Sequence, residues 1–178
     1  MRRIFLIFLA IIFFSLPVEA GILQGIGANL GVISGAGSLG DSLNLGFEGN
    51  LFLETSKFLL PLEIGLGIIY QTKREAEQTT LWMFPITLSY LKHFSGSPKY
   101  SPFVKLGAGV ALEKVSSPLH THTNSDPAFV ASLGLESRIG KKISLRTELS
   151  YRFILQRYIE EARYNGHFIS FCVGIIYE

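Results

Sequence analysis

The stretch FVKLGAGVALEKV, residues 103–115, alternates between two kinds of side chain. Every second position is apolar, and this set comprises Val104, Leu106, Ala108, Val110 and Leu112. The positions between them mix charge, glycine and small or aromatic residues, as in Phe103, Lys105, Gly107, Gly109, Ala111 and Glu113. Successive side chains of a β-strand point to opposite faces. The pattern therefore predicts a strand with one unbroken apolar face and one face that carries charges and glycines.

Seven further segments repeat this alternation. They cover residues 22–34, 42–54, 59–70, 80–92, 128–139, 143–155 and 167–177. On the eight apolar faces we assign one charged residue, Lys92, at the end of its segment. After Gly21 no apolar run approaches the roughly 20 residues of a membrane-spanning helix. The alternation instead predicts eight β-strands.

Charged residues gather on the opposite faces of these strands. They are Glu48, Glu54, Glu63, Lys105, Glu113, Glu136, Arg138, Arg146, Glu148 and Arg152. A charge on the lipid-facing side of a barrel costs about 2–4 kcal/mol near the middle of the bilayer, so this segregation is typical of a barrel in lipid. A soluble barrel that binds an apolar ligand would show the reverse pattern, and a soluble sandwich remains an alternative. Because open sheet edges are not tolerated in hydrocarbon, we predict an all-β, eight-stranded antiparallel up-and-down transmembrane β-barrel over residues 21–178.

The first 20 residues, MRRIFLIFLAIIFFSLPVEA, have the charged start, apolar core and small-residue end of a secretory signal peptide. We expect cleavage after Ala20; an uncleaved membrane anchor is the alternative. The chain has 16 basic and 14 acidic residues, of which Arg2, Arg3 and Glu19 belong to this leader. The mature chain is thus nearly neutral, which gives no support for nucleic-acid binding. The single cysteine, Cys172, is expected to pack inside the barrel.

The connections between strands differ in length. The longer, more polar ones are predicted as outer loops at about 35–41, 71–79, 114–127 and 156–166, and the others as periplasmic turns at about 55–58, 93–101 and 140–142. With this orientation an aromatic belt is expected at the outer rim, from Tyr70, Trp82, Phe129, Tyr151 and Phe153, and a thinner one at the periplasmic rim, from Tyr90 and Tyr177. Pro85 lies in the middle of a predicted strand, where proline indicates a bulge.

These features resemble the small outer-membrane β-barrels, such as the transmembrane domain of outer-membrane protein A, outer-membrane protein X and the opacity-type proteins. The segment SPFVKLGAGVAL, 101–112, is similar to a Pro-aromatic-x-x-x-Gly-x-Gly strand of that family, and LGLESRIGKKISLRTELSYRF, 133–153, is similar to its following hairpin. The resemblance implies a place in the bacterial outer membrane, contact with outer-membrane lipid and insertion by the barrel assembly machinery. We also expect a monomer. One departure is that Glu178 follows the aromatic Tyr177, whereas family members typically end on an aromatic residue.

The inward charges are the candidate site. We expect an ion-pair network that fills the lumen, because an eight-stranded barrel leaves little room beyond its side chains and buried charges are costly unless paired. Its predicted members are Glu48, Glu63, Lys105, Glu113, Glu136, Arg138, Arg146, Glu148 and Arg152.

The arrangement of these charges can be predicted in part. A tight turn near Gly140 should place Glu136 opposite Arg146 and Arg138 near Ser144. Lys105 and Glu148 should join them, with Glu48 and Glu63 at similar depth. A narrow pore or a proton path is the alternative role, and the excess of Glu would favour cations.

The polar connections offer further candidates. In HTHTNSD, 120–126, His120, His122 and Asp126 could bind a metal ion. Lipid A deacylases are eight-stranded barrels with a His-x-Ser pair, but this chain has no Ser in that place, so we expect neither an enzyme nor a cofactor. A last set of basic residues could bind phosphate groups above the outer rim: Lys73, Arg74, Arg157 and Arg163. The sequence therefore predicts a structural or surface-interaction role, in adhesion or envelope integrity, through the four outer loops.

Overall fold

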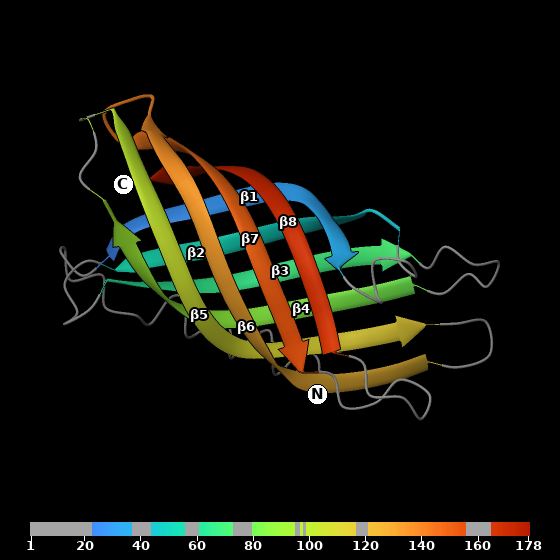
Figure 1. The fold of residues 1–178 in the computed structure, drawn as a ribbon. Helices are drawn as coiled ribbons and strands as arrows, with labels where there is room; N and C mark the ends of the chain where they lie inside the picture. Colours follow the sequence, from blue (N-terminus) through green and yellow to red (C-terminus); the bar gives the residue numbers. More distant parts are fainter. Residues whose placement is uncertain are drawn as a thin grey trace, which may run out of the picture.

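Eight antiparallel strands close into a barrel in the computed structural model of the chain (Figure 1). The model describes residues 23–36, 44–55, 61–72, 80–94, 97, 99–116, 121–155 and 165–178. The strands are β1 (Leu23–Ala36), β2 (Gly46–Thr55), β3 (Leu62–Thr72), β4 (Thr80–His93), β5 (Tyr100–Ser116), β6 (Thr121–Arg138), β7 (Ile143–Leu155) and β8 (Asn165–Tyr177). No helix within the described ranges is long and apolar enough to cross a membrane.

Closure depends on the pairing of the first strand with the last. β1 pairs antiparallel with β8, from Ile26 opposite Tyr177 to Ala36 opposite His167. Every other strand pairs with its neighbours in sequence. Both ends of the described chain therefore lie at one end of the barrel, which we call the proximal end; the end at which β1, β3, β5 and β7 finish is the distal end. The predicted all-β, up-and-down barrel is confirmed.

The predicted facing of the strands is also confirmed. Large apolar side chains point outward: Leu30 is 75% exposed, Leu106 61% and Leu133 59%. The alternate positions of the same strands are mostly buried inside. Lys114 is a second charged residue on the outward face that the sequence assignment missed; it is exposed near the distal end of β5, opposite Trp82.

The aromatic residues predicted at the outer rim gather in the distal half of the barrel. The ring centroids of Tyr70 and Trp82 are 4.6 Å apart, and those of Phe129 and Phe153 are 6.3 Å apart. The hydroxyl of Tyr151 lies 2.5 Å from Nδ1 of His167 on the neighbouring strand. These contacts are cross-strand pairs of the kind that stabilise a sheet face.

The prediction of the longest outer loop is wrong. Residues 114–127 were expected to be a loop, but β5 runs to Ser116 and β6 begins at Thr121. The two strands pair without interruption up to Ser116 opposite Thr121. The polar residues there were taken for a loop, whereas threonine fits a β-ladder well. β6 thus extends past the last β7 pair, Ala128 opposite Ile154.

The bulge predicted at Pro85 is also wrong. The β3–β4 register is the same on both sides of it, with Leu66 opposite Ile86 and Ile69 opposite Met83. The intervening pairs are missing from the ladder, as expected where proline has no N–H. A Cβ added to Gly67 would lie 2.7 Å from Cγ of Pro85, so this glycine leaves room for the proline ring. The register shift of the described strands lies in β1, between Leu23 and Gly25.

An apolar cluster crosses the distal half of the lumen. It contains inward side chains from β1 and from β3 to β8: Ile33, Ile69, Leu81, Met83, Ala111, Ala128, Ile154 and Phe168. The charged side chains lie mainly on its proximal side. The predicted signal peptide, residues 1–20, and the loop residues His120, Lys73, Arg74, Arg157 and Arg163 lie outside the described residues.

Candidate functional site: a charge network in the barrel lumen

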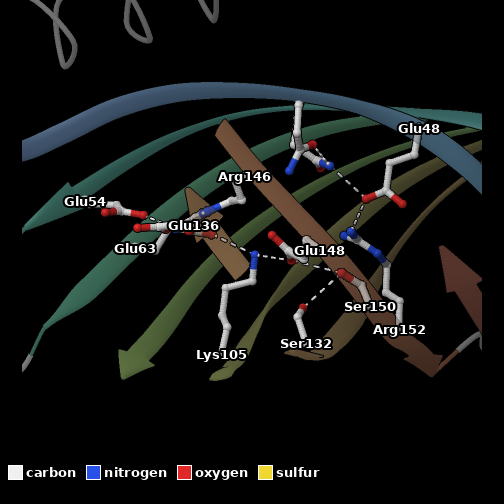
Figure 2. A network of polar contacts seen from close by, with 12 residues as sticks. Glu48, Glu54, Glu63, Lys105, Ser132, Glu136, Arg146, Glu148, Ser150 and Arg152 are labelled. Atoms are coloured by element: carbon white, nitrogen blue, oxygen red, sulfur yellow. Dashed lines mark hydrogen bonds and ion pairs between the residues drawn. The ribbon is translucent and has the colours of Figure 1, made fainter. Parts of the chain in front are cut away.

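Arg146 is the centre of the lumen network (Figure 2). Its side chain projects inward from β7 and is fully buried. Nη1 donates to Oε2 of Glu63 at 2.6 Å, and Nε donates to Oε1 of Glu136 at 2.9 Å. Nη2 donates to Glu136 and also to Glu54. One guanidinium therefore joins carboxylates from β2, β3 and β6.

Two aromatic rings enclose this guanidinium. Its central carbon lies 4.4 Å from the ring centroid of Phe52 and 4.5 Å from that of Phe103. Arginine stacks well on aromatic faces, and the attraction is stronger where water is excluded. The rings thus stabilise the charge from directions that the carboxylates do not occupy.

The strand register explains why these groups meet. Glu136 lies directly opposite Arg146, and Arg138 lies opposite Ser144, as the tight turn predicted. Glu54 lies directly opposite Glu63 on β2 and β3. Like charges in that position repel each other. Arg146 reaches both carboxylates from the other side of the lumen and compensates for the repulsion.

Lys105 forms a second bridge beside the first. Its Nζ lies 2.9 Å from Oε1 of Glu63 and 2.6 Å from Oε1 of Glu148. Ser150 donates to the same oxygen of Glu148 at 2.9 Å, and Ser132 donates to Ser150 at 2.9 Å. This group links β3, β5, β6 and β7.

Arg152 and Glu48 form a third pair, nearer the distal end (Figure 2). Asn50 donates to Oε1 of Glu48 at 2.9 Å and to Oδ1 of Asn29 at 2.8 Å. The expectation that Glu48 and Glu63 lie at similar depth is wrong, because Glu48 is opposite Ile69, six positions along β3 from Glu63.

Arg138 does not belong to the lumen network, contrary to prediction. It is the last residue of β6, and its side chain is 56% exposed. Nη2 lies 3.1 Å from Oε2 of Glu178, whose Oε1 accepts a hydrogen bond from Ser144. Alternation alone assigned Arg138 to the inward face, but the lumen ends before this position.

Glu113 is inward and buried, as predicted, but lies apart from Arg146. It is eight residues from Lys105 along β5 and opposite Met83 of the apolar cluster. Asp126 is another buried carboxylate in this half, opposite Ala111. Sequence reasoning had placed Asp126 in a loop.

The metal site suggested for His120, His122 and Asp126 is not assembled by the described residues. His122 and Asp126 are four positions apart on an extended strand, which separates them by about 13 Å. His122 is exposed at the distal end, while Asp126 is buried.

Carboxylates outnumber cations among the buried side chains that the structure describes. The acidic ones are Glu48, Glu54, Glu63, Glu113, Asp126, Glu136 and Glu148, and the basic ones are Lys105, Arg146 and Arg152. A cavity of about 20 Å³ lies between the second and third groups, beside Asn50, Lys105 and Arg152. That volume holds about one water molecule. The thiol of Cys172 is free and buried, as predicted.

Sequence reasoning missed three contributors to the site. Glu54 was assigned to an inward face but not to the network, and Asn50 and His93 were not considered. His93 lies with Nδ1 3.6 Å from Oε2 of Glu136. A signal existed for Glu54, because the short turn between β2 and β3 brings it opposite Glu63.

Comparison with known proteins identifies the fold. No family model and no curated protein sequence matches the chain. Among solved structures, Neisserial surface protein A matches with a TM-score of 0.61 at 14% identity, over 86% of this chain and 95% of the other. Ail, the attachment invasion locus protein of Yersinia pestis, matches with a TM-score of 0.52 at 15% identity, over 86% and 94%. Ail in complex with the heparin analogue sucrose octasulfate matches with a TM-score of 0.50 at 14% identity, over 86% and 94%. The chain has the fold of the small eight-stranded outer-membrane barrels.

Proposed function

We propose that this protein is an outer-membrane barrel whose lumen is structural and whose function is surface binding at the distal end, which faces the outside of the cell. The proposal agrees with the apolar outward face, since only a lipid environment suits such a surface over a whole closed barrel.

The packing of charged and apolar side chains in the lumen is the observation that carries the proposal. Arg146 is fully buried among carboxylates in the proximal half, and the apolar cluster crosses the distal half. A water-filled path would have to pass both. The cavity between charged groups has room for about one water molecule, which favours a packed lumen over a conducting one.

The distal end offers the surface for binding. The β5–β6 hairpin carries the outward polar residues Thr121, Thr123 and Ser125 beyond the apolar part of β6. Four basic residues follow in the sequence after strands that finish at this end: Lys73 and Arg74 between β3 and β4, and Arg157 and Arg163 between β7 and β8. Sulfate and phosphate groups are the ligands that such residues prefer. The names of two structural neighbours, a surface protein and an attachment protein crystallised with a heparin analogue, support the same proposal.

Binding of intact cells to a sulfated-glycan surface tests this function. Cells that display the wild-type barrel should adhere, and a variant with Lys73, Arg74, Arg157 and Arg163 all changed to Gln should lose most of the adhesion. The matched control changes four basic residues of the proximal end to Gln: Lys92, Lys99, Lys141 and Lys142. It should adhere like the wild type, and equal loss in both variants would contradict the proposal.

Two other functions are separated by direct assays. Steady cation conductance in planar bilayers would indicate that the lumen transports ions and is not merely structural. Release of acyl chains from lipid A would indicate that the protein is an enzyme and not a surface-binding protein. We expect neither activity.

A further inference from the structure

Three potential metal ligands converge at the proximal mouth of the lumen. Glu54 of β2, His93 of β4 and Glu136 of β6 each offer one ligand atom, and these atoms lie within 4.8 Å of one another. The three strands are not neighbours in the sheet, so closure of the barrel is what brings these residues together. Figure 2 shows the carboxylates of Glu54 and Glu136 beside Arg146.

The local charge favours a divalent cation. The proximal network contains the carboxylates of Glu54, Glu63, Glu136 and Glu148 but only two cations, Arg146 and Lys105. The carboxylates of this group therefore outnumber its cations by two. A bound divalent ion would compensate for this excess. Buried charge without compensation is unfavourable, so this excess is a driving force for binding.

The atoms that Arg146 leaves available suit such an ion. Arg146 binds Oε1 of Glu136, whereas Oε2 faces His93 at 3.6 Å from Nδ1. Nδ1 of His93 also lies 3.2 Å from Oγ of Ser101, and Nε2 has no hydrogen-bond partner in the structure. Arg146 can orient the two carboxylates, as outer partners commonly do around bound metal ions.

One of the three side chains is partly exposed to solvent at this end. The side chain of His93 is 27% exposed, while those of Glu54 and Glu136 are 4% and 10% exposed. The histidine is thus the most exposed of the three side chains. An ion can reach the site without crossing the apolar cluster of the distal half.

We propose that Glu54, His93 and Glu136 bind a divalent transition-metal ion, Zn²⁺ by preference, at the proximal mouth. One imidazole and two carboxylates form a nitrogen–oxygen ligand set that zinc accepts, with a remaining position for water. Mg²⁺ and Ca²⁺ prefer sites made of oxygen atoms alone. This proposal is independent of the surface-binding function.

Isothermal titration of the purified, chelator-treated barrel in detergent with ZnCl₂ tests the proposal. We expect one Zn²⁺ per barrel, no comparable binding of Mg²⁺, and a higher urea midpoint for unfolding when Zn²⁺ is present, because an ion that binds only the folded state stabilises it. Zn²⁺ should also protect His93 from modification by diethylpyrocarbonate, mapped by mass spectrometry. This second measurement needs no variant.

Histidine variants provide the matched controls. His93→Ala should weaken Zn²⁺ binding by more than about tenfold, since loss of even an outer partner costs about 10–100-fold. His122→Ala and His167→Ala, whose imidazoles belong to the distal half, should bind as the wild type does. Heat-modifiable migration on an unboiled gel confirms that each variant is folded. Absence of Zn²⁺ binding by the wild type, or equal binding by His93→Ala, overturns the site.

Discussion

Arg146 shows how a charge can be stable at the centre of a protein. Removing a guanidinium from water costs several kcal/mol, and good geometry has to offset that cost. Here three carboxylates accept its hydrogen bonds and two aromatic rings cover its faces. Because these partners come from four different strands other than β7, the side chain also links opposite walls of the barrel.

Arg146→Met should therefore be strongly destabilising. The substitution leaves Glu54, Glu63 and Glu136 buried without their shared cation. Breaking a buried pair by removing one partner costs about 3–5 kcal/mol. Urea unfolding of the barrel refolded into lipid vesicles measures the loss.

Arg138→Gln is the control for this prediction. The same type of side chain is exposed there and paired with Glu178, so the expected loss is about 0–1 kcal/mol. Similar losses at both positions would mean that Arg146 is hydrated and that the lumen is open to water.

Prediction of the network from sequence succeeded where a short turn fixed the register. Glu136 opposite Arg146 follows from the turn near Gly140. The contact between Arg146 and Glu54 could not be predicted in the same way, since it crosses the lumen between β7 and β2. Such contacts depend on the tilt and curvature of the closed sheet, which alternation does not specify.

At the scale of elements, inward Gly109 and outward Gly49 differ in how closely the neighbouring strand approaches them. A Cβ added to Gly109 of β5 would lie 1.9 Å from the carbonyl oxygen of Ile86 on β4. A Cβ added to Gly49 of β2 would lie 3.1 Å from Cδ2 of Leu30, a flexible side chain that is 75% exposed. The two glycines are thus in very different surroundings.

Gly109→Ala should lower the free energy of unfolding by at least about 1–3 kcal/mol, the usual cost of overpacking. Gly49→Ala should be close to neutral, because Leu30 can move away and alanine restricts the unfolded chain. Urea midpoints of the two variants, measured in the same vesicles, give the comparison. A tolerated alanine at position 109 would show that β4 and β5 can separate more easily than their register indicates.

β6 crosses from an apolar environment to a polar one along a single face. Leu133 and Thr123 both point outward from this strand. Leu133→Arg should lower stability by about 2–4 kcal/mol or block insertion, as for a charge near the middle of the bilayer. Thr123→Arg should cost about 0–1 kcal/mol, since it lies at or beyond the interface. Folding yield on unboiled gels and urea unfolding report both effects, and equal effects would mean that this face does not contact lipid.

Sequence analysis missed the first residues of β6 because of their composition. Residues 121–126 are polar and precede Pro127, and such a stretch usually indicates a connection. Residues 121–126 nevertheless belong to β6, because each of them has a cross-strand partner in β5. Pro127 is tolerated because the β6–β7 ladder begins only at Ala128.

For the whole molecule, the sequence predicted closure and facing because each follows from a simple physical requirement. Closure follows from the need to satisfy backbone groups in lipid, and facing follows from the cost of charged side chains on the lipid side. It did not predict that the lumen is divided into a charged proximal part and an apolar distal part. Phe168, Ile154 and Met83 were simply inward positions in the sequence pattern; only the closed sheet brings them together.

Orientation is a property of the whole barrel, and cysteine labelling of intact cells tests it. Cys172 is 2% exposed, so the native thiol should remain unlabelled while the barrel is folded. Thr121→Cys introduces a thiol at the exposed distal end, and Lys141→Cys introduces one at the exposed proximal turn. If the distal end faces outward, a membrane-impermeant maleimide should label position 121 in intact cells and position 141 only after the outer membrane is disrupted. Labelling of position 141 alone would show that the barrel has the opposite orientation. The distal end would then face the periplasm, and the proposed surface-binding function would be contradicted.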